Sequence, residues 1–370
     1  MRAVVTRKTG QAFTVSDVNI AEPVGHEVLV EVRASGLCHS DISVAQTGMG
    51  GDWPMVLGHE IAGVVVAVGP SASRIKLGDH VVAAALRPCG RCRACLKGAV
   101  WACSESDALD RDPEEKPRLE DEHGAIGQMQ GLGGFAEKVL VHENQLVSID
   151  PAMPFEQASI IGCAVATGGG VVLNVAKVQP GESIAVFGCG GVGLNTIQVA
   201  ALAGATRIIG VDIQPDKLEL ARRFGATDVI DSTKADVVES IQQLTESGGV
   251  DHAFVMVGVP QVTQTALQIL GQSGTVYLVG GMSPGAEVTL HPSPGDSLLL
   301  PFQQGIRGTW LGSSNFYHDI PMYVDLYLQG RLNLDDLVSQ TISLDEIDKA
   351  YEELERGGIA RSVITFPASS

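Results

Sequence analysis

The sequence predicts an α/β protein in which a β-rich part is joined to a doubly wound parallel sheet. In the first 160 residues, apolar and polar residues alternate in short runs, which is typical of strands with one buried face. From about Ala164 onward, short apolar runs alternate with helix-length segments, which is typical of a parallel sheet covered on both faces. The 370 residues are enough for two domains, because one core rarely grows beyond about 250–300 residues.

The composition is that of a globular protein, with 45% hydrophobic and 18% charged residues. A formal net charge of −18 argues against nucleic acid or an anionic membrane as a partner. The segment 183–206 carries no charge, but its glycines and polar residues predict a strand, a turn and a helix instead of a membrane span. Charged residues interrupt the start of the chain, so we see no secretory signal and expect a cytoplasmic location.

The first half is expected to contain strands bounded by glycine, at 27–36, 58–69 and 78–86. The segment 104–123 is acidic, carries two prolines and lacks periodicity. We therefore expect it to be an exposed insertion whose charges face solvent.

In the second half, strands and helices are expected in strict alternation. The predicted strands are 183–188, 207–212, 228–231, 250–258 and 275–281. The predicted helices between them are 191–204, 214–225, 236–249 and 260–274. Two further helices at 319–330 and 344–358 precede a closing strand at 362–366.

Four of the seven cysteines are crowded into one short stretch with the spacing C-x2-C-x2-C-x7-C, namely Cys89, Cys92, Cys95 and Cys103. Disulfides are disfavoured in the cytoplasm, and seven is an odd number. Short spacings let thiolates converge on one ion, and zinc favours four such sulfurs in a tetrahedron at about 2.3 Å. Such a closed site stabilises a loop and leaves no position for a substrate.

The run Gly188 to Gly193 has the pattern G-x-G-x-x-G between a predicted strand and a predicted helix. Gly188 allows the tight turn, Gly190 lets the backbone approach a pyrophosphate, and Gly193 lets the helix pack on the strand. Gly191 and Val192 complete the loop. The helix N-terminus then offers free N–H groups to the phosphates.

Asp212 ends the second strand of this unit, 24 positions after Gly188 (212 − 188). A carboxylate there can accept hydrogen bonds from an adenosine ribose and would repel a 2′-phosphate, which favours NAD over NADP. Lys217 is close enough in sequence to reach the same ribose, and Cys189 is expected to fill space. The alternative for Asp212 is a turn or helix-capping carboxylate.

Cys38, His59 and Cys163 could together form a second metal site. Three protein ligands with a fourth position open is the form of a catalytic zinc site. Sequence spacing does not join three residues so far apart. The alternatives are two buried cysteines and a core histidine.

The chain resembles the zinc-dependent medium-chain alcohol dehydrogenases over nearly its whole length. The motifs that carry the resemblance are GLCHSD, LGHEIAGVVVAVG, the four-cysteine lobe, IGCAVATG, GCGGVG, GVDIQPDKLELARRFGAT and GIARSVITF. The resemblance implies a GroES-like catalytic domain formed by residues 1–163, with a structural zinc lobe at 88–104, and by residues 309–370. A Rossmann NAD-binding domain at 164–308 would interrupt it.

The resemblance also implies roles for single residues and two zinc ions per chain. Cys38, His59 and Cys163 match the catalytic zinc ligands, and the four lobe cysteines match the structural ones. The remaining matches are Asp41, which orients the zinc-bound histidine; Glu60, behind the zinc; Ser40, the hydroxyl that takes the alcohol proton; His39 and Arg361, near the cofactor pyrophosphate; and Val257, in the cofactor site.

Two positions depart from the family pattern. Many relatives have a histidine three residues after the relay hydroxyl, where this chain has Ser43, so His39 or water is left as the final proton acceptor. Relatives often place an aromatic residue just before the lobe, where this chain has Ala83, Ala84 and Ala85. We infer a roomier pocket for bulkier alcohols, aromatic or terpenoid.

The expected function is hydride transfer between a primary or secondary alcohol and NAD. A first alternative is a formaldehyde dehydrogenase that depends on glutathione or mycothiol. That branch carries an arginine shortly after the fourth lobe cysteine, where this chain has Asp107, although Arg111 is nearby. A second alternative is a protein that binds NAD and zinc without turnover. We expect a homodimer that pairs through 305–314, with a homotetramer as the alternative.

Overall fold

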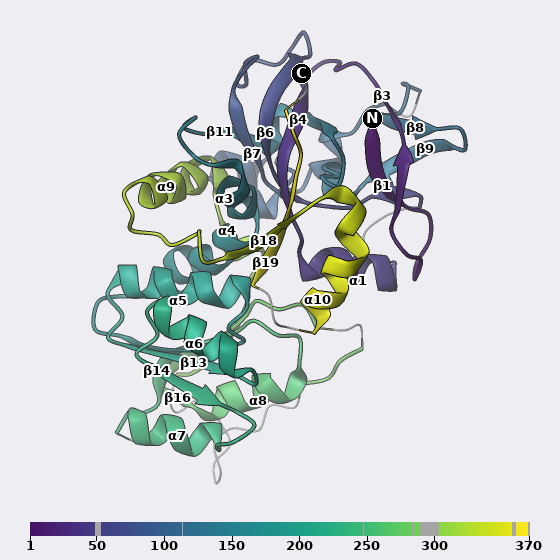
Figure 1. The fold of residues 1–370 in the computed structure, drawn as a ribbon. Coiled ribbons are helices and arrows are strands. Elements are labelled where there is room, and N and C mark those ends of the chain that lie inside the picture. The colour runs from purple at the N-terminus through teal and green to yellow at the C-terminus, as the bar shows by residue number, and fades with distance from the viewer. Residues whose placement is uncertain are drawn as a thin grey trace. The chain divides into compact units, whose positions relative to one another are not determined.

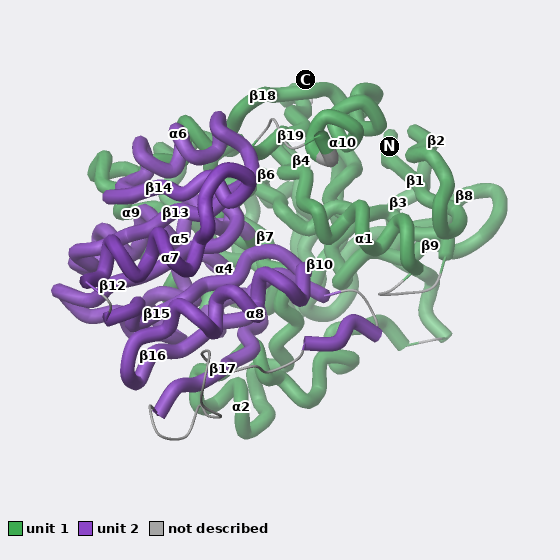
Figure 2. Tube along the Cα trace, turned by 90° about the horizontal axis from the view of Figure 1, so that it is seen from below, with its two compact units in different colours: residues 1–163, 315–370 green, residues 164–314 purple. Residues whose placement is uncertain are grey.

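The computed structural model describes residues 1–48, 53–112, 114–246, 248–282, 285–288, 303–356 and 360–368. The chain forms two compact units, shown in Figure 2: unit 1 comprises residues 1–163 and 315–370, and unit 2 comprises residues 164–314. The predicted domains share the first of these boundaries, and their second boundary, after residue 308, lies six residues earlier (314 − 308).

The described residues of unit 1 form two sheets of largely antiparallel strands (Figure 1). The first has the order β2-β1-β5-β9-β8-β3 and is built from β1 (Arg2–Thr6), β2 (Thr14–Asp17), β3 (Asn19–Ile20), β5 (Met55–Val56), β8 (Leu119–Asp121) and β9 (Gly124–Gln128). The second has the order β11-β7-β6-β4-β19-β18, with β10 also paired to β4. Its strands are β4 (Glu27–Gly36), β6 (Glu60–Val68), β7 (His80–Ala83), β10 (Lys138–His142), β11 (Leu146–Ser148), β18 (Val338–Ile342) and β19 (Arg361–Thr365).

The three strands predicted for the first half are present as β4, β6 and β7. Strand β18 was not predicted, because its sequence VSQTI is too polar to stand out as a strand. It forms because it pairs with the buried strand β19. Pairing with a neighbouring strand therefore stabilises a strand that the local sequence does not predict.

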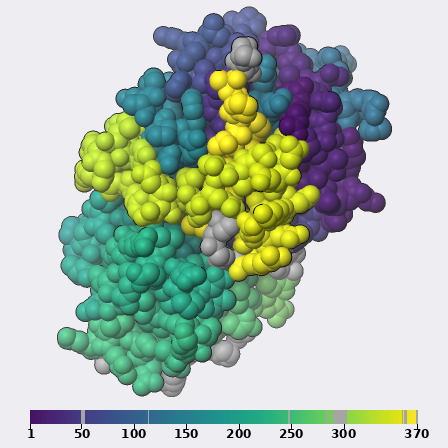
Figure 3. Space-filling model, viewed as in Figure 1, coloured from purple at the N-terminus to yellow at the C-terminus, as the bar shows by residue number. Residues whose placement is uncertain are grey.

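The helices of unit 1 are α1 (His39–Thr47), α2 (Arg93–Leu96), α3 (Phe155–Ser159), α9 (Phe316–Leu328) and α10 (Ile347–Glu355). Helix α10 lies at the surface, in the yellow C-terminal segment of Figure 3. Ile347, Ala350, Tyr351 and Leu354 form its buried face at the spacing of an amphipathic helix. This face packs into a core with residues of β1, β5 and β19. The predicted helix 344–358 extended further, but residues 357–359 lie outside the described part of the chain.

The acidic segment 104–123 is largely exposed, as predicted, but a few of its residues anchor it to the body of unit 1. Leu109 and Leu119 are almost fully buried, with 2% and 1% of their surfaces exposed. The Arg111 guanidinium donates hydrogen bonds to the buried Glu27 carboxylate, with an Nε–Oε1 distance of 2.8 Å. Two apolar anchors and an ion pair therefore hold this mostly exposed segment against the unit, which its polar composition did not predict.

Unit 2 contains a six-stranded parallel sheet among its described residues, in the order β14-β13-β12-β15-β16-β17. Its strands are β12 (Ser183–Phe187), β13 (Arg207–Asp212), β14 (Asp228–Asp231), β15 (Val250–Val255), β16 (Leu270–Leu278) and β17 (Gly305–Gly308). The order reverses between β12 and β15, which is the arrangement of a doubly wound sheet. This confirms the predicted parallel sheet.

Helices cover both faces of this sheet: α4 (Ala164–Gly170), α5 (Gly191–Ala203), α6 (Pro215–Arg223), α7 (Val237–Leu244) and α8 (Pro260–Gln268) belong to unit 2. Ile197 of α5 and Ala221 of α6 lie against Gly210 on one face of β13. Helices α7 and α8 share a core with Ile209 and Val211, which face the other way along the same strand.

Helix α8 ends earlier than predicted, because β16 begins at Leu270 inside the expected helix 260–274. The Val250 amide donates a 2.9 Å hydrogen bond to the Ile269 carbonyl, and Leu270 pairs with Val250 of β15. Strand pairing therefore overrides the helical pattern of this apolar segment.

The uncharged segment 183–206 folds as β12 and α5, as predicted. In the described part of the chain, no single helix has the length and apolar composition of a membrane span. A bent pair of helical segments, 155–162 followed by 164–176, meets those two criteria together.

We expect Gly193→Ala to destabilise unit 2, because a Cβ atom there would lie 1.9 Å from the Gly188 carbonyl oxygen. Overpacking of this kind costs about 1–3 kcal/mol or more, which corresponds to a drop of several degrees in melting temperature. Gly190→Ala is the matched control, because nothing lies within 4 Å of its added Cβ. Calorimetry that finds equal melting temperatures for the two variants would contradict the prediction.

Candidate metal centres and dinucleotide loop

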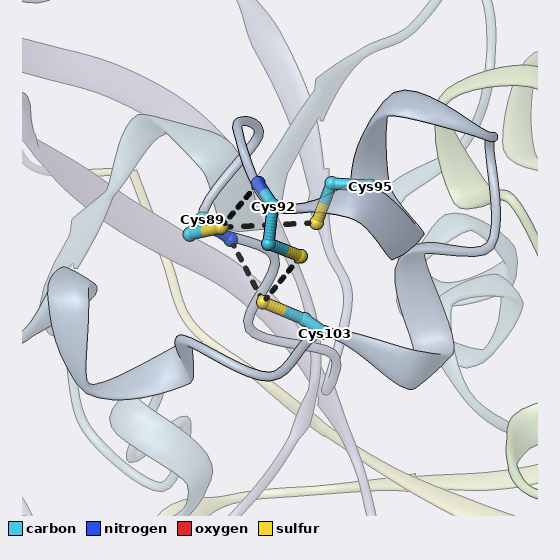
Figure 4. A group of neighbouring side chains, drawn as sticks. All are labelled: Cys89, Cys92, Cys95 and Cys103. Atoms are coloured by element: carbon cyan, nitrogen blue, oxygen red, sulfur yellow. Dashed lines mark hydrogen bonds between the residues drawn. The ribbon is translucent and has the colours of Figure 1, made fainter.

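The four lobe cysteines converge on one point, with every pair of sulfurs within 4.8 Å (Figure 4). The Cys89 and Cys95 sulfurs are 4.0 Å apart, and those of Cys92 and Cys103 are 3.9 Å apart. A zinc ion about 2.3 Å from four tetrahedral sulfurs would place them about 3.8 Å from one another. The geometry therefore fits a closed zinc site.

Backbone amides surround these sulfurs with hydrogen-bond donors. The Cys92 amide donates to Cys89 Sγ at 3.2 Å, and the Cys89 amide donates to Cys103 Sγ at 3.2 Å. Amides of Cys95 and Ser104 lower the pKa of Cys92 to about 6, whereas burial raises the pKa of Cys95 to about 12. The amides thus favour the thiolate of Cys92, which is the form that binds metal, whereas a metal ion would have to displace the proton of Cys95.

The structure also brings together Cys38, His59 and Cys163, which sequence spacing could not join. Their ligand atoms and a Glu60 oxygen all lie within 4.8 Å of one another, and all four residues are buried. Cys38 follows β4, His59 precedes β6, and Cys163 ends a short 3-10 helix. Two thiolates and an imidazole are a donor set that suits zinc, so these residues fit a second metal site.

The Asp41 carboxylate holds the two N-terminal ligand segments in place. Its Oδ1 accepts hydrogen bonds from His59 Nδ1 and the Gly58 amide, both at 3.0 Å, and its Oδ2 accepts one from the Cys38 amide at 3.1 Å. Because a carboxylate only accepts, the His59 proton is on Nδ1, and Nε2 keeps its lone pair for a metal. Asp41 is completely buried, as expected for a residue that orients a ligand.

Glu60 and Arg361 form a buried ion pair next to this cluster, with 3.4 Å between Arg361 Nη2 and Glu60 Oε1. Burial raises the pKa of Glu60 to about 7, although the Arg361 charge lowers it. Hydrogen bonding with Cys163, together with the Arg361 charge, lowers the pKa of Cys38. Arg361 was predicted near the cofactor pyrophosphate, and that role stays a prediction.

Sequence reasoning missed Gly36, which makes room for the Glu60 carboxylate. The two residues face each other across β4 and β6, and a Cβ atom on Gly36 would lie 2.2 Å from Glu60 Oε2. The only available sign in the sequence was a glycine at the end of a strand, two residues before Cys38.

The predicted relay residues lie in the first two turns of α1. Ser40 is exposed, and its Oγ is 3.6 Å from Cys38 Sγ. His39 and Ser43 are exposed as well. The three small residues Ala83, Ala84 and Ala85 are buried at the end of β7.

In unit 2, the glycine loop has the geometry that its motif requires. Gly188 adopts a φ of +98°, and its carbonyl oxygen leaves no space for a side chain at Gly193. Val257 lies against Gly188, and the Asp212 Oδ2 accepts a 2.8 Å hydrogen bond from the Cys189 amide. The structure therefore places these predicted cofactor residues around one loop at the ends of β12, β13 and β15.

Asp212 also accepts hydrogen bonds from the Ile213 amide at 2.8 Å and the Gln214 amide at 3.0 Å. It therefore stabilises the turn that follows β13, which was the alternative reading of this residue. Lys217 lies in the first turn of α6. Cys189 is fully buried, and burial raises its pKa well above the usual range, so it fills space as expected.

Two family models match the chain: the alcohol dehydrogenase GroES-like domain at residues 25–151 and the zinc-binding dehydrogenase domain at residues 191–329. The S-(hydroxymethyl)glutathione dehydrogenase of Paracoccus denitrificans is 34% identical over 377 aligned residues, which cover 99% of each chain. The chain belongs to the zinc-dependent medium-chain alcohol dehydrogenase family. The predicted family and the predicted α/β fold class are confirmed.

Other members of this family are equally similar. The NDMA-dependent alcohol dehydrogenase of Amycolatopsis methanolica is 35% identical over 99% of both chains. The crystal structure of benzyl alcohol dehydrogenase from Acinetobacter calcoaceticus is 34% identical over 99% of both chains, with a TM-score of 0.91. Membership of the family makes this chain an oxidoreductase that works with zinc and a nicotinamide cofactor.

We expect Cys103→Ala to remove one zinc per chain and to lower the melting temperature, because the lobe would lose a ligand of a closed structural site. Zinc content by atomic absorption and a thermal melt measure both effects. Cys189→Ala removes a buried thiol outside both clusters and should keep the full zinc content. If Cys103→Ala retained as much zinc as Cys189→Ala, the lobe would not be a metal site.

Proposed function

We propose that the chain is a zinc- and NAD-dependent alcohol dehydrogenase that oxidises primary or secondary alcohols to aldehydes or ketones, or catalyses the reverse. The observation that carries this proposal is the buried convergence of Cys38, His59 and Cys163. A zinc ion held there would supply a Lewis acid that lowers the pKa of an alcohol. With the lobe, the proposal requires two zinc ions per chain.

The chain's own residues would orient the ligands and move the proton. Asp41 keeps the His59 proton on Nδ1, so that Nε2 faces the other ligands. Ser40 Oγ, next to Cys38 and exposed at the start of α1, would accept the proton of the alcohol and pass it on. Since the family histidine is replaced by Ser43, we assign the final transfer to His39 or water.

The choice of NAD follows from Asp212 at the end of β13. Its carboxylate lies beside the glycine loop, where it can exchange amide hydrogen bonds for those of a ribose diol. A 2′-phosphate would meet this negative charge without a compensating arginine in the motif. We propose that Gly190, Val192 and Val257 contact the remainder of the cofactor.

The small side chains of Ala83, Ala84 and Ala85 support a bulky, aromatic or terpenoid alcohol as substrate. A thiol-dependent formaldehyde dehydrogenase is the second candidate, because one relative is an S-(hydroxymethyl)glutathione dehydrogenase. Its adduct needs a cationic partner near the lobe. Arg111 is engaged by the Glu27 carboxylate and by the Lys116 and Glu22 carbonyls, which argues against that role.

We also propose a homodimer formed through β17, which lies at the edge of the parallel sheet with Arg307 and Trp310 exposed beside it. An open sheet edge of this kind can pair with a second copy. Only β17, Gly305–Gly308, is a strand in the longer segment predicted for pairing. All seven cysteines are free thiols, which supports the cytoplasmic location.

We expect alcohol-dependent formation of NADH, measured at 340 nm, with faster turnover of benzyl, cinnamyl and terpenoid alcohols than of ethanol and without a need for glutathione or mycothiol. Cys38→Ala should lower kcat by about 10³-fold or more while the fold is retained, because a ligand of the reacting centre is lost. Turnover of no alcohol, or of formaldehyde only with a thiol, would refute this proposal and favour one of the alternatives.

We expect Asp212→Asn to shift the cofactor preference toward NADP by roughly tenfold or more in kcat/KM, because the negative charge facing the 2′ position is removed. Asparagine keeps an oxygen for the loop amides. Asp216→Asn, an exposed carboxylate in the next turn, should leave the preference unchanged. If Asp212→Asn left the ratio of kcat/KM for NAD to that for NADP unchanged, another residue would determine the preference at the 2′ position of the ribose.

A further inference from the structure

Tyr351, on the inward face of α10, has a buried hydroxyl that makes no hydrogen bond of ordinary geometry with any described residue. Only 5% of the residue is exposed. Its ring stacks on Phe13 with centroids 4.9 Å apart and meets the edge of Phe135 at 6.3 Å. An apolar clamp of this kind would hold phenylalanine equally well, so the packing does not explain the hydroxyl.

The clamp lies in the core that adjoins the proposed catalytic metal site. Phe135 packs directly against Gly58, whose amide donates to Asp41 Oδ1. Leu37 and Ile42, which flank the Cys38–Asp41 segment, belong to the same buried core as Tyr351. After burial itself, the negative charge of Asp41 is the main cause that raises the pKa of Tyr351, followed by that of Cys38.

The Asp41 carboxylate has room for one more donor. A carboxylate offers about four lone-pair sites, of which Oδ1 uses two and Oδ2 uses one. The Asp41 carboxylate acts on the Tyr351 hydroxyl through its charge and a side-chain interaction, both of which raise the pKa of Tyr351, but the pair does not reach ordinary hydrogen-bond geometry. A small rotation of either side chain would pair the one unsatisfied donor with the one unused acceptor site.

The surroundings also favour a neutral donor. Asp41, Glu60 and Cys38 act on the Tyr351 hydroxyl with negative charge. A hydroxyl can stabilise a carboxylate there without adding a second buried cation next to Arg361. Buried carboxylates keep a fixed orientation only when their oxygens are hydrogen-bonded.

We propose that Tyr351 is a positioning residue whose hydroxyl donates to Asp41 Oδ2 and so fixes the carboxylate that orients His59. This inference rests on the proposed metal site at Cys38, His59 and Cys163. It assigns to α10, far away in sequence, the outermost layer of support for that site. It predicts that removal of the Tyr351 hydroxyl oxygen speeds the loss of zinc from the Cys38 cluster.

The test compares Tyr351→Phe with Tyr323→Phe in the full-length, zinc-loaded protein. Tyr323, in α9 of the same unit, is also fully buried with a hydroxyl that has no hydrogen-bond partner among the described residues. Its neighbouring charge is Asp319 instead of the metal cluster. The two variants therefore remove the same atom from buried sites, and Asp41 acts on the hydroxyl only in the first.

Two readouts report on the site without turnover: the rate of zinc loss to a chelator, and the visible absorption of protein reloaded with Co²⁺. We expect Tyr351→Phe to lose the zinc of the Cys38 cluster roughly tenfold faster, at the low end of the 10–100-fold found for direct partners of ligands. Its Co²⁺ spectrum should shift. Tyr323→Phe should match the wild type in both.

Wild-type rates and spectra in Tyr351→Phe would overturn the inference. Wild-type protein that holds no metal at the Cys38 cluster would instead overturn the proposed function. The Cys103→Ala variant measures this directly: because it lacks the lobe zinc, any zinc that it retains is bound at the Cys38 cluster. If Tyr351→Phe does not fold, 3-fluorotyrosine at position 351 replaces it. Its more acidic hydroxyl should shift the Co²⁺ spectrum, and an unshifted spectrum would again overturn the inference.

Discussion

The arrangement of the candidate catalytic site depends on the Asp41 carboxylate and on the strand register that presents it. Asp41 binds the Cys38 amide, the Gly58 amide and the His59 imidazole, so one carboxylate joins the end of β4 to the start of β6. These strands are neighbours, with Gly36 opposite Glu60. A slip of one residue would turn every side chain of a strand to the other face and would separate the ligands.

This register has an electrostatic consequence. It brings Cys38, Asp41 and Glu60 together in one buried place. There the charges of Arg361 and His59 lower the pKa of Glu60, and those of Cys38 and Asp41 raise it. Burial of several anions without compensation is strongly unfavourable. A divalent cation among the two sulfurs and the imidazole would supply the missing positive charge, so the charge balance and the ligand geometry favour the same occupant.

The local motifs could be predicted from sequence, and the nonlocal contacts could not. The glycine loop at 188–193 and the lobe cysteines are recognisable because each site is built within a few residues, and the alternating pattern of unit 2 indicated its parallel sheet. The trio of Cys38, His59 and Cys163 was recognisable only through resemblance to a family. The Glu60–Arg361 pair joins strands whose sequences carry no sign of each other.

The incomplete predictions have the same origin. The segment 104–123 is mostly exposed, as its composition predicted, but the composition did not show that a long-range ion pair with Glu27 anchors it. Helix α8 was predicted too long, because local periodicity cannot show that Leu270 pairs with Val250. In both places a contact between distant parts of the chain determines what a local preference does not.

The two cysteine clusters differ both in how easily the sequence reveals them and in the role proposed for them. In the lobe, sulfurs are stabilised by amides of their own loop, so the site is saturated, local and easily recognised. In the other cluster, the ligands come from three distant segments, and a side-chain carboxylate, not a backbone turn, fixes the histidine. Because no single loop closes around that cluster, its fourth position can be left to Glu60 or to a substrate. In the proposed function, the open coordination position therefore belongs to the cluster whose long-range assembly makes it hard to predict from sequence.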